Sequence, residues 1–253
     1  RMIPERIAHL DMDKEGLKEL ITEHRKDHPS GCAIDLFRPL QGDMFNTICL
    51  PFTLDLKTLP EDHPLKNATL KHYIALRLNT VGGEKVLELV FDDVPTENGQ
   101  QILEANKPYI IQPKDDYNSI IRFAGPLILT DTVGNEDTHD ADSYSITYKG
   151  IIPPQEVTPT IQDGVSLTLM LVADNRLAEL TTQSLMYGFR GYFLINQPLP
   201  QGTQSRLSFS RPTATGLINV DGKLINVQKY LQEGRIYIRL DDQVYDLTGA
   251  RVQ

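Results

Sequence analysis

The amino-acid sequence predicts an all-β fold, an antiparallel, jelly-roll-like β-sandwich with one N-terminal amphipathic helix and a small C-terminal β-module. From Cys32 onward, apolar and polar residues alternate with a period of two, which is typical of strands with one buried face. About ten such runs follow one another at a spacing of roughly 8–15 residues, with Pro and Gly between them, as in β-sandwiches. One run, 44–52, is apolar on both faces and is therefore expected inside the sandwich.

The composition is that of a folded globular protein. The chain has 253 residues, of which 40% are apolar and 23% are charged, and its formal net charge is −9. These fractions argue against a disordered chain. The acidic balance argues against a nucleic-acid partner, because binding to phosphates depends on basic patches. The sequence has no run of about 18 apolar residues, so no transmembrane segment is expected.

A single helix is expected near the N-terminus, after a short opening segment at 4–10. Asp13 is expected to cap it, because an aspartate oxygen accepts hydrogen bonds from the first free backbone N–H groups. The helix is expected to run to about Lys26 and to end before Pro29-Ser30-Gly31. Its apolar stripe has the spacing i, i+3, i+4 and i+7 and consists of Leu17, Leu20, Ile21 and His24.

The clearest strand prediction is a β-hairpin in which 72–78 and 85–92 flank a turn at Gly82-Gly83. Segment 143–149 alternates so regularly that its three apolar side chains are expected to share the core face. The remaining expected strands are 33–37, 44–52, 108–112, 120–124, 167–173, 176–180, 189–196 and 206–210.

A change of composition at 211–216 divides the chain into two expected domains. Residues 1–212 would form the sandwich with its helix, and residues 213–253 would form a small C-terminal β-hairpin module. Within this module, 234–240 and 243–247 are expected to pair across Asp241-Asp242. Roughly 40 residues bury little core on their own, so the module is expected to lean on the sandwich or to pair with another partner.

An acidic segment, 135–142, offers carboxylates at a spacing of two residues. Asp137, Asp140 and Asp142 are the candidate metal ligands, because Ca²⁺ prefers carboxylate oxygens. The segment lacks the glycine and the closing glutamate of an EF-hand loop, so a solvated charged loop is the favoured interpretation. No cofactor is expected.

The densest aromatic cluster supplies the candidate ligand-binding residue, Tyr192. Aromatic faces on β-sandwich modules can stack on sugar rings, and Tyr192 has the opposite parity to Phe189 and Phe193, which are expected in the core. The chain contains no tryptophan, the usual anchor of such a platform. No catalytic residue is expected, because the sequence has no GxSxG motif and its adjacent Asp pairs diverge.

The two cysteines, Cys32 and Cys49, are compatible with one disulfide or with two buried thiols. Buried thiols are favoured, because Cys49 lies in the run that is apolar on both faces. A thiol in such surroundings is expected to be inert, since burial disfavours the thiolate.

Three segments of the expected sandwich carry a resemblance to a known type of protein. Phe45–Phe52 is similar to a strand with the sequence WNTLCLPF, with Phe45 where Trp is usual. Lys107–Pro113 is similar to TPYLIKP, and Arg190–Phe193 is similar to RAYF. These segments occur, in this order, in a widespread type of exported protein from Bacteroidales bacteria.

The C-terminal segments Gly234–Ile238 and Tyr245–Val252 are similar to the β-module of many secreted and surface proteins of the same phylum. The resemblance implies an exported protein with its signal peptide removed, located at the cell surface, at the outer membrane or outside the cell. Such domains often form the C-terminal part of leucine-rich-repeat or other adhesin-like chains, and no catalytic residues come with them. This chain departs from that pattern because it lacks a repeat array and its terminal module is shorter than a full type IX sorting domain.

The function expected from the sequence is therefore a non-enzymatic secreted or cell-surface binding protein, adhesin-like, whose partner is a protein or a glycan at the cell surface. A carbohydrate-binding module is the first alternative. A glycan-processing hydrolase is the second, and it would need a pocket with two carboxylates about 5–9 Å apart.

Overall fold

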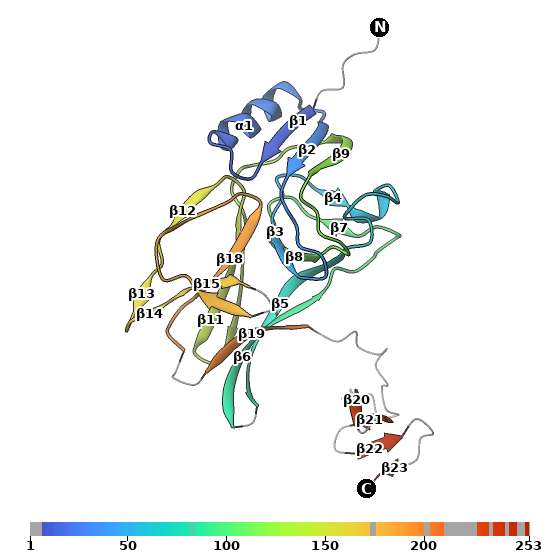
Figure 1. Cartoon of the computed structure of the whole chain (residues 1–253), viewed down its shortest axis with the longest axis vertical. Helices are drawn as coiled ribbons and strands as arrows, with labels where there is room; N and C mark the ends of the chain where they lie inside the picture. The colour runs from blue at the N-terminus through green and yellow to red at the C-terminus, as the bar shows by residue number, and fades with distance from the viewer. Residues whose placement is uncertain are drawn as a thin grey trace. The chain divides into compact units, whose positions relative to one another are not determined.

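The structure is a computed structural model in which the chain divides into two compact units, Arg1–Phe209 and Ser210–Gln253 (Figure 1). The described part is mostly β, with several mainly antiparallel sheets and one short α-helix. The predicted domain boundary at 212 lies outside the described residues. These are 7–81, 83–172, 176–199 and 203–209, with the backbone of 227–232, 235–240, 243–246 and 251–252.

The chain begins with a β-α-β unit. Strands β1 (Ile7–Asp11) and β2 (Cys32–Phe37) pair in parallel, with α1 (Leu17–Asp27) between them along the chain. Strand β9 (Ile120–Leu127) pairs antiparallel with the other edge of β2, and α1 lies beside these strands (Figure 1). The opening segment expected at 4–10 contributes to β1, and the parallel pairing of β1 with β2 departs from the predicted antiparallel arrangement, because the 11-residue α1 returns the chain to the start of a parallel neighbour.

Helix α1 begins later than predicted. Its N-cap is Gly16, with φ 77°, and no side chain caps the helix. Asp13 lies in the preceding turn, where its backbone N–H donates to Oδ1 of Asp11 at 3.4 Å. Leu17 and Ile21 of the predicted stripe are buried, so the stripe faces the core as predicted.

The predicted hairpin is confirmed as β5 (Thr69–Val81) and β6 (Glu84–Asp93). It is the middle of a five-stranded sheet with the order β19-β6-β5-β8-β3. Strand β8 (Tyr109–Gln112) and β3 (Asn46–Ile48) extend it on one side. Strand β19 (Gln204–Phe209) pairs in parallel with β6 on the other side, a second departure from the predicted antiparallel pairing.

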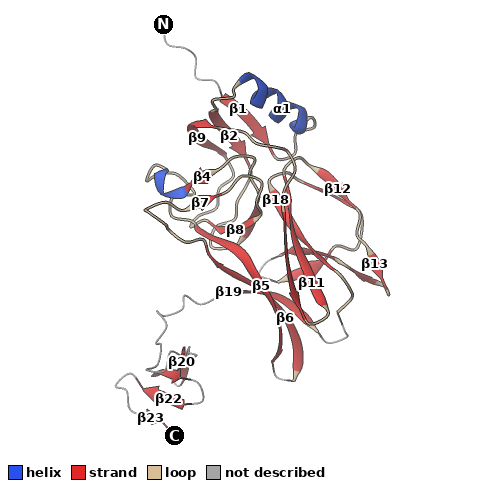
Figure 2. Cartoon of the chain, turned by 180° about the vertical axis from the view of Figure 1, so that it is seen from behind, coloured by secondary structure: helices blue, strands red, loops and turns tan. Residues whose placement is uncertain are grey.

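A second five-stranded sheet has the order β10-β11-β18-β15-β16. Its strands, all antiparallel to their neighbours, are β10 (Glu136–Ala141), β11 (Tyr144–Ile151), β15 (Thr168–Leu171), β16 (Leu177–Glu179) and β18 (Arg190–Ile195). Figure 2 shows the long strands of both sheets from the opposite side.

The two five-stranded sheets share one apolar cluster. Phe91 of β6, Tyr148 of β11 and Phe193 of β18 are buried in it, and the rings of Tyr148 and Phe193 stack with their centroids 4.4 Å apart. The hydroxyl of Tyr148 donates a hydrogen bond to the backbone oxygen of Tyr109 in β8, 2.6 Å away. This bond satisfies the one polar atom of a fully buried ring.

Shorter elements complete the first unit. They are β4 (Leu54–Asp55) with β7 (Ile102–Leu103), β12 (Gln155–Val157) with β17 (Ser184–Met186), β13 (Ile161–Gln162) with β14 (Val165–Ser166), and the 3-10 helix η1 (Leu56–Thr58). None of the helical residues that the structure describes forms a helix long and apolar enough to cross a membrane.

The second unit contains a four-stranded antiparallel sheet with its strands in chain order. These strands are β20 (Val227–Gln232), β21 (Arg235–Leu240), β22 (Gln243–Asp246) and β23 (Arg251–Val252). The predicted pairing of 234–240 with 243–247 is confirmed by β21 and β22, whose register places Leu240 opposite Gln243.

Residues 47–52 of the segment 44–52 are buried as predicted and 44–46 are half-buried, but the segment is not one long central strand. Only β3 pairs, and β3 forms the edge of its sheet. Beyond β3, other parts of the chain bind the buried backbone: Cys49 N–H donates to Phe189 O, and the oxygens of Leu50 and Pro51 accept from Asn106 and Thr130. The segment thus passes between elements, and each of these contacts satisfies a polar group that water cannot reach.

Candidate functional site

The acidic segment 135–142 is a strand and not the predicted loop. Its residues 136–141 form β10, whose neighbour is β11. Because side chains alternate across a strand, Asp137 and Asp140 point to opposite faces of the sheet. Asp137 is half-buried, and its Oδ1 lies 3.3 Å from Nε2 of His139. Asp142 follows in the turn, with φ 52°.

The candidate metal ligands therefore do not converge on one point. Within the ranges that the structure describes, no group of three His, Cys, Asp or Glu side chains is arranged to hold a metal ion. The tight antiparallel turn from β10 into β11 separates carboxylates that a calcium loop would have wrapped around the ion.

Tyr192, the candidate sugar-stacking residue, is only 6% exposed. It points away from Phe193, as its parity predicts, but this second face of β18 is also covered. Tyr192 packs there with Ile151, Val157 and Met186. The expectation of an exposed ring is wrong, because β12 and β17 supply a cover that strand parity alone does not reveal.

Both cysteines are buried free thiols. Burial raises the pKa of Cys49 to about 12 and also raises the pKa of Cys32. The thiol of Cys49 donates to the backbone oxygen of Asn106, 3.2 Å away. The prediction of buried, unreactive thiols agrees with this geometry, since the nucleophilic form of cysteine is the thiolate.

A hollow of about 450 Å³ lies where the start of β5, the end of β6 and the chain around β7 and β8 meet. Its polar lining includes His72, Glu104 and Lys107. Nζ of Lys107 lies 3.5 Å from Oε1 of Glu104 and 5.5 Å from the centre of the Tyr109 ring. We call this hollow the β5–β8 pocket, and its lining is His72, Val94, Pro95, Glu97, Asn98, Gln100, Ile102, Glu104, Lys107 and Tyr109.

Burial lowers the pKa of His72, and the nearby Lys107 contributes to the lowering. His72 is therefore neutral near pH 7, with one ring nitrogen as a donor and the other as an acceptor. Burial raises the pKa of Tyr109, whose hydroxyl accepts a hydrogen bond from the backbone N–H of Glu104 at 3.3 Å. The pocket thus combines neutral and charged hydrogen-bonding groups.

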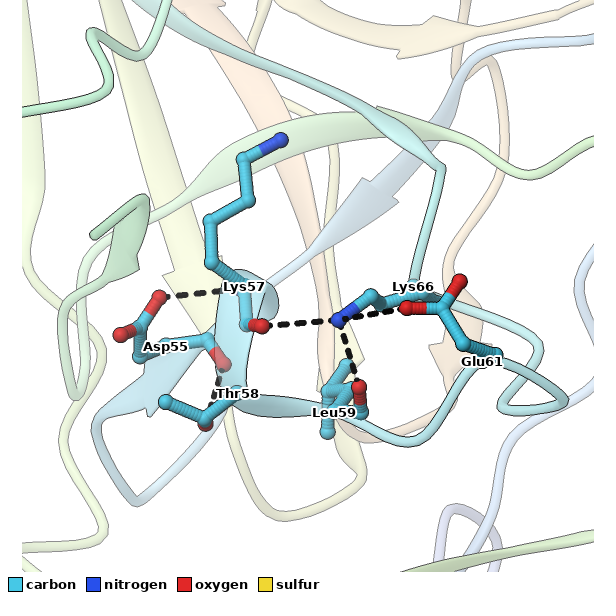
Figure 3. A network of polar contacts seen from close by, with 6 residues as sticks. All are labelled: Asp55, Lys57, Thr58, Leu59, Glu61 and Lys66. Carbon is cyan, nitrogen blue, oxygen red and sulfur yellow. Dashed lines mark hydrogen bonds and ion pairs between the residues drawn. The ribbon is translucent and has the colours of Figure 1, made fainter. Parts of the chain in front are cut away.

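A polar network joins η1 and the loop after it to the start of β7, and Ile102 of β7 lines this pocket (Figure 3). Oδ1 of Asp55 accepts from the backbone N–H groups of Lys57 and Gln101, each at 3.0 Å, and so joins η1 to the start of β7. Nζ of Lys66 donates to the backbone oxygens of Lys57 and Leu59 at 2.8 and 2.7 Å, and lies 3.4 Å from Oε1 of Glu61. This network holds the loop that positions β4 and, through it, β7.

A second, smaller hollow of about 110 Å³ lies between the turn after β2 and the start of β18. We call it the arginine pocket, because Arg38 and Arg190 both line it. The rest of its lining is Gln41, Met44, Phe45, Asn46, Thr47, Leu171 and Val172.

The sequence analysis missed both pockets. The available signal for the arginine pocket was that Arg38 follows an apolar strand directly and Arg190 opens another one. A charge at such a place is expected near a boundary between core and surface. No comparable signal marks the β5–β8 pocket, whose lining consists of His72 and nine residues of the segment 94–109.

The chain was compared with family models, with curated proteins and with solved structures. None of these comparisons finds a match.

Proposed function

We propose that the chain is a non-enzymatic binding protein, secreted or held at the cell surface, and that a polar group of its ligand enters the β5–β8 pocket. The observation that carries this proposal is the lining of that pocket, in which hydrogen-bonding side chains stand beside the apolar walls of Val94, Pro95 and Ile102. Its volume of about 450 Å³ falls within the range of roughly 300–1,000 Å³ that is typical of ligand sites.

The chemistry of the pocket favours a ligand rich in hydroxyl or amide groups. Glu104 accepts hydrogen bonds, Lys107 donates them, and neutral His72 does both. The ion pair between Glu104 and Lys107 is partly exposed. A ligand can therefore replace water around these two side chains at a small cost in free energy.

Two further parts of the proposal come from the sequence. A jelly-roll-like sandwich is supported by the apolar cluster that the two five-stranded sheets share. Export, a location at the cell surface and an adhesin-like role are supported by the resemblance of Phe45–Phe52 and of the C-terminal segments to exported Bacteroidales proteins.

A carbohydrate-binding module is the first alternative, because sugar hydroxyls suit the same polar lining. It would bind without the exposed aromatic platform that was expected at Tyr192. A glycan-processing hydrolase is the second alternative, because Glu97 and Glu104 line one pocket and paired carboxylates are the usual catalytic groups of such enzymes.

The test is binding of the labelled protein to an array of glycans and to a panel of extracellular-matrix proteins. We expect binding to at least one of them, weakened about tenfold or more by Lys107→Gln and by Glu104→Gln. Arg77→Gln, which changes an exposed cation on β5, is the matched control and should bind like the parent. The proposal fails if nothing on either panel binds, or if all four proteins bind equally.

The same glycans also test the hydrolase alternative. Release of reducing sugar by the parent, abolished by Glu104→Gln or Glu97→Gln, would replace the non-enzymatic proposal with that of an enzyme.

A further inference from the structure

Arg38 carries a positive charge into the protein interior, and no carboxylate among the described residues pairs with it. Its side chain is 2% exposed, and its guanidinium donates to three backbone oxygens. These are Phe189 O at 3.2 Å from Nε, Pro39 O at 2.5 Å from Nη1 and Thr47 O at 2.6 Å from Nη2. Carbonyl dipoles satisfy the hydrogen bonds but leave the net charge in place.

The pKa of Arg38 reflects this buried positive charge. Burial and, to a smaller extent, the positive charge of Arg190 together lower its pKa to about 9. A buried charge without a counter-charge is costly, so a nearby anion would stabilise both guanidinium groups.

Arg190, the second arginine of the arginine pocket, also lacks a carboxylate partner in the described part of the chain. Its Nε is buried and has no hydrogen-bond partner among the residues that the structure describes. One of its terminal nitrogens, Nη2, has only a weak contact, with Sδ of Met12 at 3.7 Å. Along the described parts of the chain, no carboxylate forms an ion pair with either Arg38 or Arg190.

The remaining lining adds no negative charge. Gln41, Asn46 and Thr47 are neutral and polar, and the amide nitrogen of Asn46 is engaged by the backbone oxygens of Gln41 and Met44, each at 2.9 Å. The volume of about 110 Å³ exceeds the roughly 30 Å³ of one water molecule and suits a single tetrahedral anion.

We propose that the arginine pocket binds one oxyanion group, a phosphate or a sulfate. Arg190 presents the fork of donors that matches two oxygens of such a group, and Arg38, fixed by three carbonyls, supplies a second positive charge. The group would be the charged end of a larger ligand or a free anion, since Val172, one of the lining residues, is exposed to solvent. This site is separate from the β5–β8 pocket and does not depend on its function.

The test titrates the full chain with sodium phosphate and, separately, with sodium sulfate, against sodium chloride at matched ionic strength. Heteronuclear NMR follows the Nε–Hε signal of Arg190, and calorimetry gives the dissociation constant. We expect a saturable shift with phosphate or sulfate and none with chloride. The tighter of the two anions identifies the ligand class.

Substitution separates a specific site from a general salt effect, which matters because both anions stabilise most proteins by exclusion from their surface. Arg190→Gln should weaken binding about ten- to a hundredfold, because a charge-assisted hydrogen bond is lost. Arg190→Lys keeps the positive charge and is the second variant to use if Arg190→Gln does not fold. It should bind the anion more weakly than the parent, because lysine lacks the forked donors of arginine. Arg77→Gln is the matched control and should keep the parent affinity.

Two results would overturn the proposal. One is an equal response of the parent, Arg190→Lys and Arg77→Gln to each anion. The other is a parent whose Arg190 signal moves with chloride as much as with phosphate and sulfate.

Discussion

The Nε of Arg38 donates a hydrogen bond to the carbonyl oxygen of Phe189, 3.2 Å away and 151 residues further along the chain. The same oxygen accepts a second hydrogen bond from the backbone N–H of Cys49 at 3.3 Å. One buried acceptor thus joins the end of β2, the segment after β3 and the start of β18. Because β3 and β18 belong to different five-stranded sheets, this contact ties the two sheets together.

Replacing Arg38 by methionine should therefore destabilise the protein by about 3–5 kcal/mol, because buried oxygens lose charged donors and the replacement cannot bond them. Urea unfolding measures the change. Arg77→Met, at an exposed position, is the control and should stay within about 0.5 kcal/mol of the parent. A parental midpoint for Arg38→Met would show that the three carbonyl contacts do not stabilise the fold.

Stability should fall in acid through Asp35. Its two oxygens accept from Nε and Nη2 of Arg122, each at 2.7 Å, and these hydrogen bonds lower the pKa of the Asp35 carboxyl below its ordinary 3.8. A carboxyl with a depressed folded-state pKa contributes stability that is fully present above pH 3.8 and is lost as the pH falls through the folded-state value.

Asp35→Asn should remove the pH-dependent contribution that the Asp35 carboxylate makes to stability. We expect a lower free energy of unfolding at neutral pH and a shallower decline below about pH 4. Urea midpoints between about pH 2 and pH 7 provide the measurement. Asp115→Asn, at an exposed position, should retain the parental pH profile. An unchanged profile for Asp35→Asn would contradict the assignment.

The two thiols should be inaccessible in the native state. We expect neither Cys32 nor Cys49 to react with a thiol reagent at pH 8, and both to react once the protein is unfolded in guanidinium without reductant, because burial disfavours both thiolates. Absorbance counts the reacted groups. A protein that shows no reactive thiol after unfolding would instead contain a disulfide.

Gly150 should tolerate no side chain. A Cβ at this position would lie 2.5 Å from Sγ of Cys49, so Gly150→Ala should cost about 1–3 kcal/mol through overpacking. Cys49→Ala removes that sulfur, and the double variant should be more stable than the sum of the two single changes predicts. Additive effects in urea unfolding would show that the two residues do not contact each other in this way.

The local pattern of apolar and polar residues was sufficient to predict the elements that bury one face. The regular alternation at 143–149 predicted β11, the glycine pair at 82–83 predicted the β5–β6 turn, and the stripe of Leu17 and Ile21 predicted the buried side of α1. In each of these elements, neighbouring residues alone determine which side chains must leave water.

Elements that owe their form or burial to other elements were not predicted. Strand β10 has the polar sequence EDTHDA, and it is a strand because its backbone pairs with β11. The parallel pairing of β1 with β2 depends on where α1 docks. Tyr192 is buried because β12 and β17 lie over it, and these two strands pair although residues 158–183 separate them in the sequence.

By itself, the sequence determined that the described part of the chain is mostly β, that most of 44–52 is buried and that its cysteines avoid water, because hydrophobic periodicity is a property of neighbouring residues. Only the tertiary structure decided that Arg38 and Arg190 line one pocket and that His72 joins nine residues of 94–109 around another. Pockets arise where separate segments meet, and the free energy that brings those segments together comes from the core beneath them.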